Sequence, residues 1–281
     1  MRQIPKRKQY GCILIILCII LIGVFVIWSN NSIQISEYTY ISDQIPSGFD
    51  GYTIVQISDL HNHVFVYHDS SLLKKIKSLS PNCIVLTGDI LDNSTHSNQK
   101  DALLFTEQVT QIAKTYFVTG NHEDTMKKER RKAFIQEMKT DGVVYLSNES
   151  VHLRVENGDT MLLIGIADNS LQSNKLENIM SEQDENDVQI LLAHEPQFLN
   201  DYAETGVDIV FSGHAHGGQF RIPFTHQGLF APDQGILPEY TEGAVIKENT
   251  TMYISRGLGN SAFPFRLFNR PEIVCVTLSS Q

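Results

Sequence analysis

The most regular feature of the hydrophobic pattern is an unbroken apolar run near the start of the chain. Gly11 to Trp28 contains no charged residue and no proline. At 1.5 Å per residue, a helix of this length spans about 27 Å, close to the thickness of the hydrocarbon core of a bilayer. The run has no polar face, which a helix on the surface of a soluble domain would show. It therefore predicts a transmembrane anchor over residues 11–28.

A cleaved signal peptide is the alternative, because it shares the basic start and the apolar centre of this segment. The residues after Trp28, SNNSIQIS, offer no small-x-small cleavage site, so we expect an uncleaved anchor. Four basic residues precede the run, and none follows it until Lys74. The positive-inside rule then predicts a single-pass protein of the cell membrane. Residues 1–10 would form a basic cytoplasmic tail, and the body would lie outside the cytoplasm.

After the apolar run, short segments rich in β-branched residues alternate with segments of helical period. Residues 29–50 are polar, and we expect them to form an irregular tether before a single domain over residues 51–281. Buried strands are predicted at 53–57, 83–87, 115–119, 189–193 and 208–212, and helices near 69–79, 98–113, 125–139 and 196–204. This alternation is typical of an α/β sandwich. The later runs at 151–155, 161–166, 251–255 and 272–278 have no helices between them and predict a second, more antiparallel sheet.

Charge changes the picture in one respect. The chain of 281 residues carries 32 acidic and 22 basic side chains, a net charge of −10, and all four basic residues before Lys74 precede the apolar run. So acidic a body argues against broad binding to a nucleic-acid polymer. An anionic substrate would require the protein to recruit cations.

Each of the five predicted buried strands ends in residues that are able to bind metal ions. The candidates are Asp59 and His61, Asp89, Asn121, His194, and His214 and His216. Ligands of open α/β sheets bind at the carboxyl ends of the strands, so these residues predict one shared site. Carboxylates, imidazoles and an amide, without a thiolate, suit Mn²⁺, Fe or Zn²⁺. Seven candidate ligands exceed the need of one ion, which predicts two divalent metal ions sharing Asp89.

In this order, Asp59-x-His61, Gly88-Asp89-x-x-Asp92, Gly120-Asn121-His122-Glu123, His194 and Gly213-His214-x-His216 resemble the calcineurin-like metallophosphoesterase family, in particular a membrane-anchored bacterial branch. The resemblance covers roughly residues 52 to 260. It implies a four-layer αββα sandwich, with two mixed β-sheets flanked by helices. It also implies that Asp59, His61, Asp89 and His216 hold one metal ion, and that Asp89, Asn121, His194 and His214 hold the other.

The resemblance further implies two catalytic residues. His122 would face the substrate and stabilise the developing charge or protonate the departing oxygen. Asp92 would orient His122 through a hydrogen bond. Two other residues stay open: His63 is an extra ligand, a substrate-lining residue or simply exposed, and Arg256 is either a phosphate contact or a strand-end arginine.

The implied function is hydrolysis of a phosphate monoester or diester by metal-bound hydroxide. With the anchor, the favoured substrates are lipid head groups, lipid-linked sugars or wall polymers at the outer face of the membrane. A soluble nucleotide or another phosphomonoester is the alternative substrate. A catalytically silent metal-binding membrane module is the alternative class, but such a module should lack a ligand or His122, and none is missing.

Overall fold

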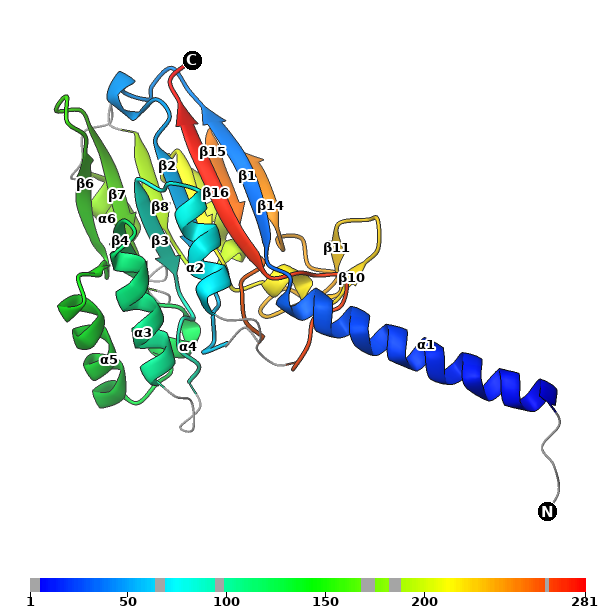
Figure 1. Ribbon diagram of the computed structural model, residues 1–281. Helices are drawn as coiled ribbons and strands as arrows, with labels where there is room; N and C mark the ends of the chain where they lie inside the picture. The colour runs from blue at the N-terminus through cyan, green and yellow to red at the C-terminus, as the bar shows by residue number, and fades with distance from the viewer. Residues whose placement is uncertain (1–5, 64–68, 94–98, 168–174, 182–187, 261–262) are drawn as a thin grey trace.

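Two six-stranded β-sheets pack face to face, with helices on both outer faces and one long helix leaving the body (Figure 1). The computed structural model describes residues 6–63, 69–93, 99–167, 175–181, 188–260 and 263–281. Within these residues, the predicted four-layer αββα sandwich is confirmed.

The first sheet combines a parallel half with two strands from the ends of the body. Its order is β1 (Gln34–Ile41), β16 (Glu272–Ser279), β2 (Thr53–Ile57), β3 (Cys83–Thr87), β4 (Lys114–Val118) and β5 (Val144–Tyr145). Strands β2 to β5 run parallel, and β16 is antiparallel to β2. Parallel neighbours need long crossovers, which contain α2 (Asp69–Ser78), α3 (Gln99–Thr110), and α4 (Asn121–Asp124) with α5 (Lys128–Thr140).

The second sheet has a parallel centre and a hairpin at each edge. Its order is β14 (Gly243–Lys247), β15 (Thr250–Ile254), β9 (Ile209–Ser212), β8 (Gln189–Leu192), β7 (Thr160–Gly165) and β6 (Glu149–Arg154). Helices α6 (Lys175–Ser181) and α7 (Leu199–Glu204) connect its parallel strands, with the 3₁₀ turn Pro196–Phe198 before α7. Beyond β9, the chain forms the 3₁₀ turn His216–Gly218 and four two-residue strands: β10 (Arg221–Ile222), β11 (Gln227–Gly228), β12 (Phe230–Ala231) and β13 (Gly235–Ile236).

Alternation along the central strands separates the layers, because successive side chains of a strand point to opposite faces. Ile54 of β2 belongs to the apolar cluster between the sheets, which also contains Phe211 of β9. Its neighbour Val55 belongs to the cluster beneath the helices, with Phe105 of α3 and Phe134 of α5. The central strands are buried on both faces, which explains their continuous apolar sequences.

One expectation from the sequence was wrong, and another was wrong in part. Residues 29–50 are not an irregular tether, because residues 34–41 form β1, an edge strand that pairs in parallel with β16 over eight residues. The second sheet does contain three of the four late runs, as β6, β7 and β15, but it does not consist of those runs alone. Its four central strands are parallel, and the late run 272–278 lies in the first sheet as β16.

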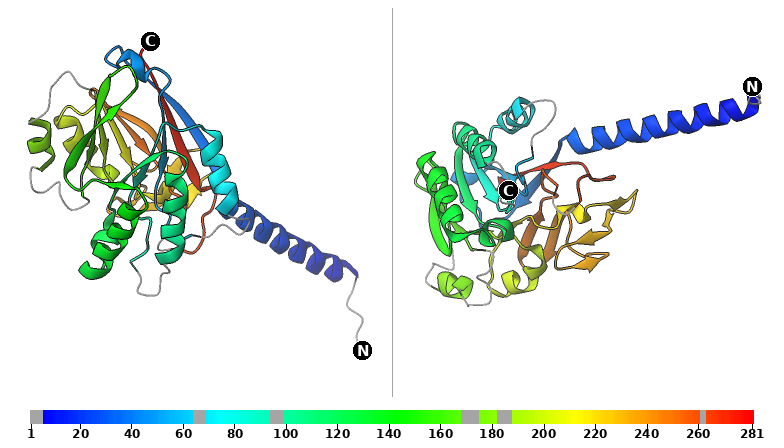
Figure 2. Two further views of the ribbon diagram at one scale, coloured as in Figure 1. Left: turned by 60° about the vertical axis from the view of Figure 1, so that its left-hand side comes forward. Right: turned by 90° about the horizontal axis from the view of Figure 1, so that it is seen from below.

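Helix α1 (Lys6–Asn31) projects away from the sandwich (Figures 1 and 2). Among the described residues, it is the one helix that is long and apolar enough to cross a membrane, by length and composition. Its end is held to the body: the Asn30 side chain accepts a hydrogen bond from the Arg266 backbone N–H (2.7 Å) and donates one to the Arg266 carbonyl (3.0 Å).

We expect β1 to be required for a stable body. Two soluble fragments, 32–281 and 43–281, both lack α1 and differ chiefly in β1. The shorter one should unfold at a lower temperature and aggregate more readily, because removing β1 turns the hydrophobic strand β16 into an exposed edge. Thermal unfolding followed by circular dichroism measures the difference, and equal midpoints would contradict the structural role of β1.

Candidate metal centre

The candidate ligands come together at one rim of the sandwich, where strands of both sheets end. Asp59 and His61 follow β2, Asp89 follows β3, and Asn121 opens α4 after β4. The second sheet contributes His194 after β8, and His214 and His216 after β9. The candidate site therefore forms where the carboxyl ends of strands from both sheets meet.

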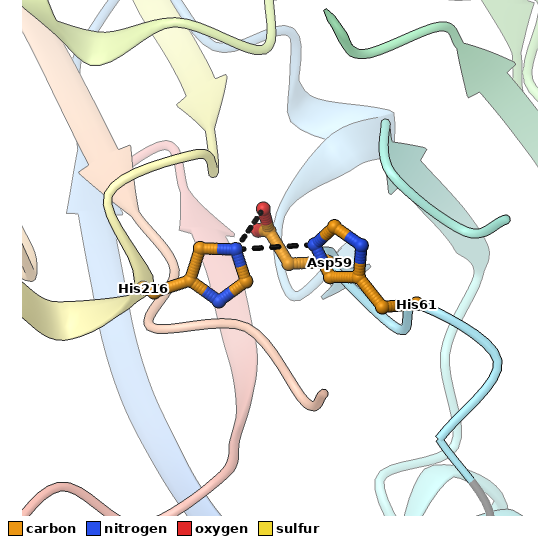
Figure 3. A group of neighbouring side chains, drawn as sticks. All are labelled: Asp59, His61 and His216. Carbon is orange, nitrogen blue, oxygen red and sulfur yellow. Dashed lines mark hydrogen bonds and ion pairs between the residues drawn. The ribbon is translucent and has the colours of Figure 1, made fainter. Parts of the chain in front are cut away.

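One group of donors consists of Asp59, His61 and His216 (Figure 3). His216 Nε2 lies 3.1 Å from His61 Nε2 and 3.4 Å from Asp59 Oδ1. All three residues are buried. Two imidazole nitrogens and a carboxylate oxygen therefore point at a common volume.

A second group consists of Asp89, His194 and His214, to which Asn121 adds an amide oxygen. Asn121 Oδ1 lies 3.2 Å from His194 Nε2 and 3.0 Å from His214 Nδ1. Asp89 Oδ2 lies 3.3 Å from His194 Nε2 in this group and 3.6 Å from His61 Nε2 in the first. The Asp89 carboxylate thus lies between the two groups.

The backbone around these residues adopts uncommon conformations. Five candidate ligands have positive φ angles: Asp59 (51°), His61 (47°), Asp89 (53°), His214 (64°) and His216 (48°). Non-glycine residues in this region store strain, which concentrates at functional sites. Gly120 has a steric role, because a Cβ there would overlap Asp89 Oδ1 and His194 Nε2. Local conformation thus aims the donors inward.

Burial keeps the imidazoles of His61, His214 and His216 neutral. It lowers the pKa of His61 and of His214 to about 4, and it lowers the pKa of His216 well below its ordinary value. Burial raises the pKa of Asp59 to about 6, with a further contribution from the Asp89 charge. For Asp89, burial acts in the same upward direction, but His194 and His61 hold its pKa below the ordinary value. At neutral pH, these three histidines therefore keep lone pairs available for a cation.

This donor set fits divalent metal ions. The carboxylate, imidazole and amide donors converge at 3.0–3.6 Å without a nearby thiolate, a set suited to Mn²⁺, Fe or Zn²⁺. A cation would relieve the repulsion between lone pairs that face one another. The seven candidates predicted from the sequence supply all the donor atoms of these two groups.

Two supporting carboxylates were missed by the sequence reasoning. Glu123 is fully buried and accepts backbone hydrogen bonds from Asp89 (2.8 Å), Leu91 (2.9 Å) and Gly120 (2.9 Å). Burial raises the pKa of Glu123 to about 8, while these donors favour the charged form. Asp233 Oδ2 lies 2.8 Å from His214 Nε2, while the other ring nitrogen of His214, Nδ1, faces Asn121. Glu123 was visible in the Gly-Asn-His-Glu motif, whereas no pattern marks Asp233.

The two predicted catalytic residues lie at the edge of the metal centre. His122 is partly exposed; its Nε2 lies 4.0 Å from Asp89 Oδ2, and its backbone N–H donates to Asp89 Oδ1 at 2.9 Å. Asp92 Oδ2 lies 3.8 Å from His122 Nδ1 and 3.9 Å from His61 Nδ1. Both distances exceed that of a hydrogen bond, so Asp92 stands between two imidazoles instead of clamping one.

The two residues left open by the sequence lie outside the donor groups. His63 lines a small cavity with Leu72 and Phe105, and burial lowers its pKa. Arg256 is buried and pairs with Glu272 (3.0 Å) and Glu242 (3.4 Å). Neither residue belongs to a donor group of the described residues.

Residues 52–218 match the family model of the calcineurin-like phosphoesterase domain. The chain belongs to this family. It is 31% identical to the uncharacterized metallophosphoesterase YkuE of Bacillus subtilis over 253 residues, covering 89% of this chain and 87% of that protein. It is also 26% identical over 256 residues to a bovine transmembrane protein with a metallophosphoesterase domain, covering 84% of this chain and 55% of that protein. Calcineurin-like phosphoesterases typically depend on two metal ions, in keeping with the two donor groups.

Glu123→Gln should destabilise the calcineurin-like domain by about 1–3 kcal/mol, because an amide cannot accept from all three backbone donors. Chemical denaturation of the metal-free protein measures the change in the free energy of unfolding. The matched control is Glu129→Gln on the exposed surface of α5, which should stay within about 0.5 kcal/mol of the parent. Similar stability of both variants would show that Glu123 does not support the loops.

Proposed function

We propose that this protein is a metal-dependent phosphoesterase that hydrolyses phosphate monoesters or diesters at a membrane surface. The observation that carries the proposal is the position of Asp89 Oδ2, within 3.6 Å of His61 and 3.3 Å of His194, between two buried donor groups. A shared carboxylate suits two ions that act together on one phosphate. The family membership of the chain supports the same reaction class.

The proposed ligands divide into two sets that share Asp89. Asp59, His61 and His216 would hold one ion with Asp89, and Asn121, His194 and His214 would hold the other. Bound divalent cations would supply Lewis acidity and neutralise the charge that develops on phosphate oxygens. The neutral imidazoles and the amide add no negative charge, so two divalent cations would outweigh the two carboxylates and leave a positive site that attracts an anionic substrate.

His122 is proposed to act on the substrate, since it is the partly exposed histidine beside the donor groups. Its Nδ1 lies 3.4 Å from the backbone N–H of Asn93, an arrangement in which Nδ1 accepts and Nε2 carries the proton. An Nε2–H directed toward the site would stabilise a phosphate oxygen or protonate the departing one. Asp92 is proposed to be a positioning residue through its charge, given its distances from His122 and His61.

Attachment of the domain to a membrane would favour substrates that lie at the membrane surface. Helix α1 is proposed to be an uncleaved anchor, with the catalytic domain on the extracytoplasmic side, following the basic residues that precede it. Because only two residues separate α1 from β1, the domain would remain close to the bilayer. Lipid head groups, lipid-linked sugars and wall polymers are therefore the proposed phosphoester substrates. Higher rates on nucleotides than on head-group phosphoesters would contradict this choice of substrate.

Removal of one proposed ligand should lower the metal content of the protein. We expect the protein to bind two divalent ions and His216→Ala to lose one of them, because His216 joins the group with Asp59 and His61. The measurement is elemental analysis of dialysed protein together with calorimetric titration with Mn²⁺. His226→Ala is the matched control, since His226 is exposed and pairs with Glu242. Unchanged metal content in His216→Ala would contradict the assignment.

Activity should require both metal and His122. In the presence of Mn²⁺, the protein should hydrolyse bis-p-nitrophenyl phosphate or p-nitrophenyl phosphate, and a chelator should abolish the reaction. His122→Ala should lower kcat by about 100-fold or more while retaining its metal, because it removes a positioned proton donor. His152→Ala, an exposed histidine of β6, serves as the control. Absence of turnover on both esters by the metal-loaded protein would exclude the enzyme and favour a silent metal-binding module.

A further inference from the structure

The large exposed hydrophobic side chains of the body gather in two loops. Outside α1, nine of the twelve in the described residues lie in segments 222–237 and 263–268, which we call the rim loops. They are Ile222, Phe224, Leu229, Phe230, Ile236, Leu237, Phe263, Phe265 and Phe268. Soluble surfaces rarely collect so many, and such patches mark contact with a protein, a ligand or a membrane.

The rim loops adjoin the end of α1. The ring of Phe268, 49% exposed, lies 5.2 Å from the ring of Phe25, inside the apolar part of the helix. The Arg270 guanidinium lies 5.1 Å above the ring of Trp28. Strand β10, which leads into the first rim loop, lines one cavity together with Phe25 and Trp28 of α1. Tryptophan and arginine near the end of an apolar helix are typical of a membrane interface.

A cavity of about 870 Å³ separates α1 from the first rim loop. Its apolar wall includes Phe25 and Trp28 of α1, Phe224 and Phe268. None of the seven proposed metal ligands lines it. The segment that contains Gly217 lies between the cavity and the metal centre: the Arg221 guanidinium, in the cavity wall, donates to the Gly217 carbonyl at 3.2 Å, next to His216. The cavity is therefore a neighbour of the metal centre and not part of it.

The other wall of the cavity is charged and balanced. Arg256 Nη2 lies 3.0 Å from Glu272 Oε1, and Arg221 pairs with Glu242. With Arg270 and Glu239, the wall carries three guanidinium groups and three carboxylates. A ligand of a single charge would meet as many repulsive groups as attractive ones. A zwitterion can place its anion near arginine and its cation near glutamate.

We propose that this cavity binds a zwitterionic membrane phospholipid whose glycerol and upper acyl chains contact the apolar wall. The phosphate of the head group faces the arginines and the ammonium group faces the glutamates, while the rim loops rest in the surface of the bilayer. The proposal rests on the part of the proposed function that places α1 in a membrane, and it does not depend on phosphoesterase activity.

Photocrosslinking of the full chain tests the proposal. The protein is reconstituted into nanodiscs of equimolar phosphatidylethanolamine and phosphatidylglycerol, with p-benzoylphenylalanine in place of Phe224 or, separately, Phe268. Lipid adducts are identified by mass spectrometry. The same probe at Ile20 of α1 samples bulk lipid, and at Ile246 (73% exposed, β14) and Leu104 (49% exposed, α3) it samples exposed hydrophobic positions elsewhere on the body.

We expect adducts at positions 224, 268 and 20 and none at 246 or 104. Adducts at positions 224 and 268 should be richer in phosphatidylethanolamine than those at position 20 by at least about threefold. Labelling at position 20 without labelling at 224 and 268 would overturn the proposal. Equal labelling at 246, or a lipid composition at 224 and 268 identical to that at 20, would overturn it too. Because no outcome depends on turnover, failure here is distinct from failure of the proposed enzymatic function.

Discussion

The constraint on which this structure depends is the burial of donors that repel one another. Asp59 and Asp89 are withdrawn from water, and three of the imidazoles around them are held neutral, with ring nitrogens 3.0–3.6 Å from other donors. Without compensation, such a cluster is unfavourable, because charged and polar groups lose hydration on burial. Divalent cations at its centre would turn this repulsion into coordination. The donor atoms of the site thus surround volumes that suit cations.

The scaffold holds that cluster in place through the backbone geometry of its turns and through hydrogen bonds between them. Parallel strands of two sheets end at one rim, and the turns that follow them adopt left-handed conformations at Asp59, Asp89 and His214. Glu123 joins the turn after β3 to the turn after β4 by accepting N–H groups from both. Strain at each turn is thus offset by hydrogen bonds and by the packed sheets behind it. A change in one turn would move ligands that belong to both donor groups.

Local pattern in the sequence predicted the strands that build this rim. The runs at 53–57 and 83–87 coincide with β2 and β3, because strands buried on both faces leave an unbroken apolar signature. The metal-ligand types at their ends identified the seven residues that the structure brings together. What failed was what depends on non-local pairing. The sequence QISEYTYI of β1 alternates like a half-exposed edge strand and contains many polar residues. Its pairing partner, β16, lies more than 200 residues further along the chain. Asp233 reaches His214 only through the tertiary fold, so spacing gave no sign of it.

The joint between α1 and the body has a consequence for how substrates are found. Asn30 holds the Arg266 backbone with two hydrogen bonds, and the Arg266 guanidinium lies 3.3 Å from His216 Nδ1. An enzyme attached to a membrane by a long flexible tether samples a volume of solvent above the membrane. If α1 lies in a bilayer, this joint would hold the metal centre at one height and tilt above the membrane, and its search would be reduced to lateral diffusion in two dimensions. Encounter would then depend on the surface density of the substrate, not on its concentration in the surrounding volume.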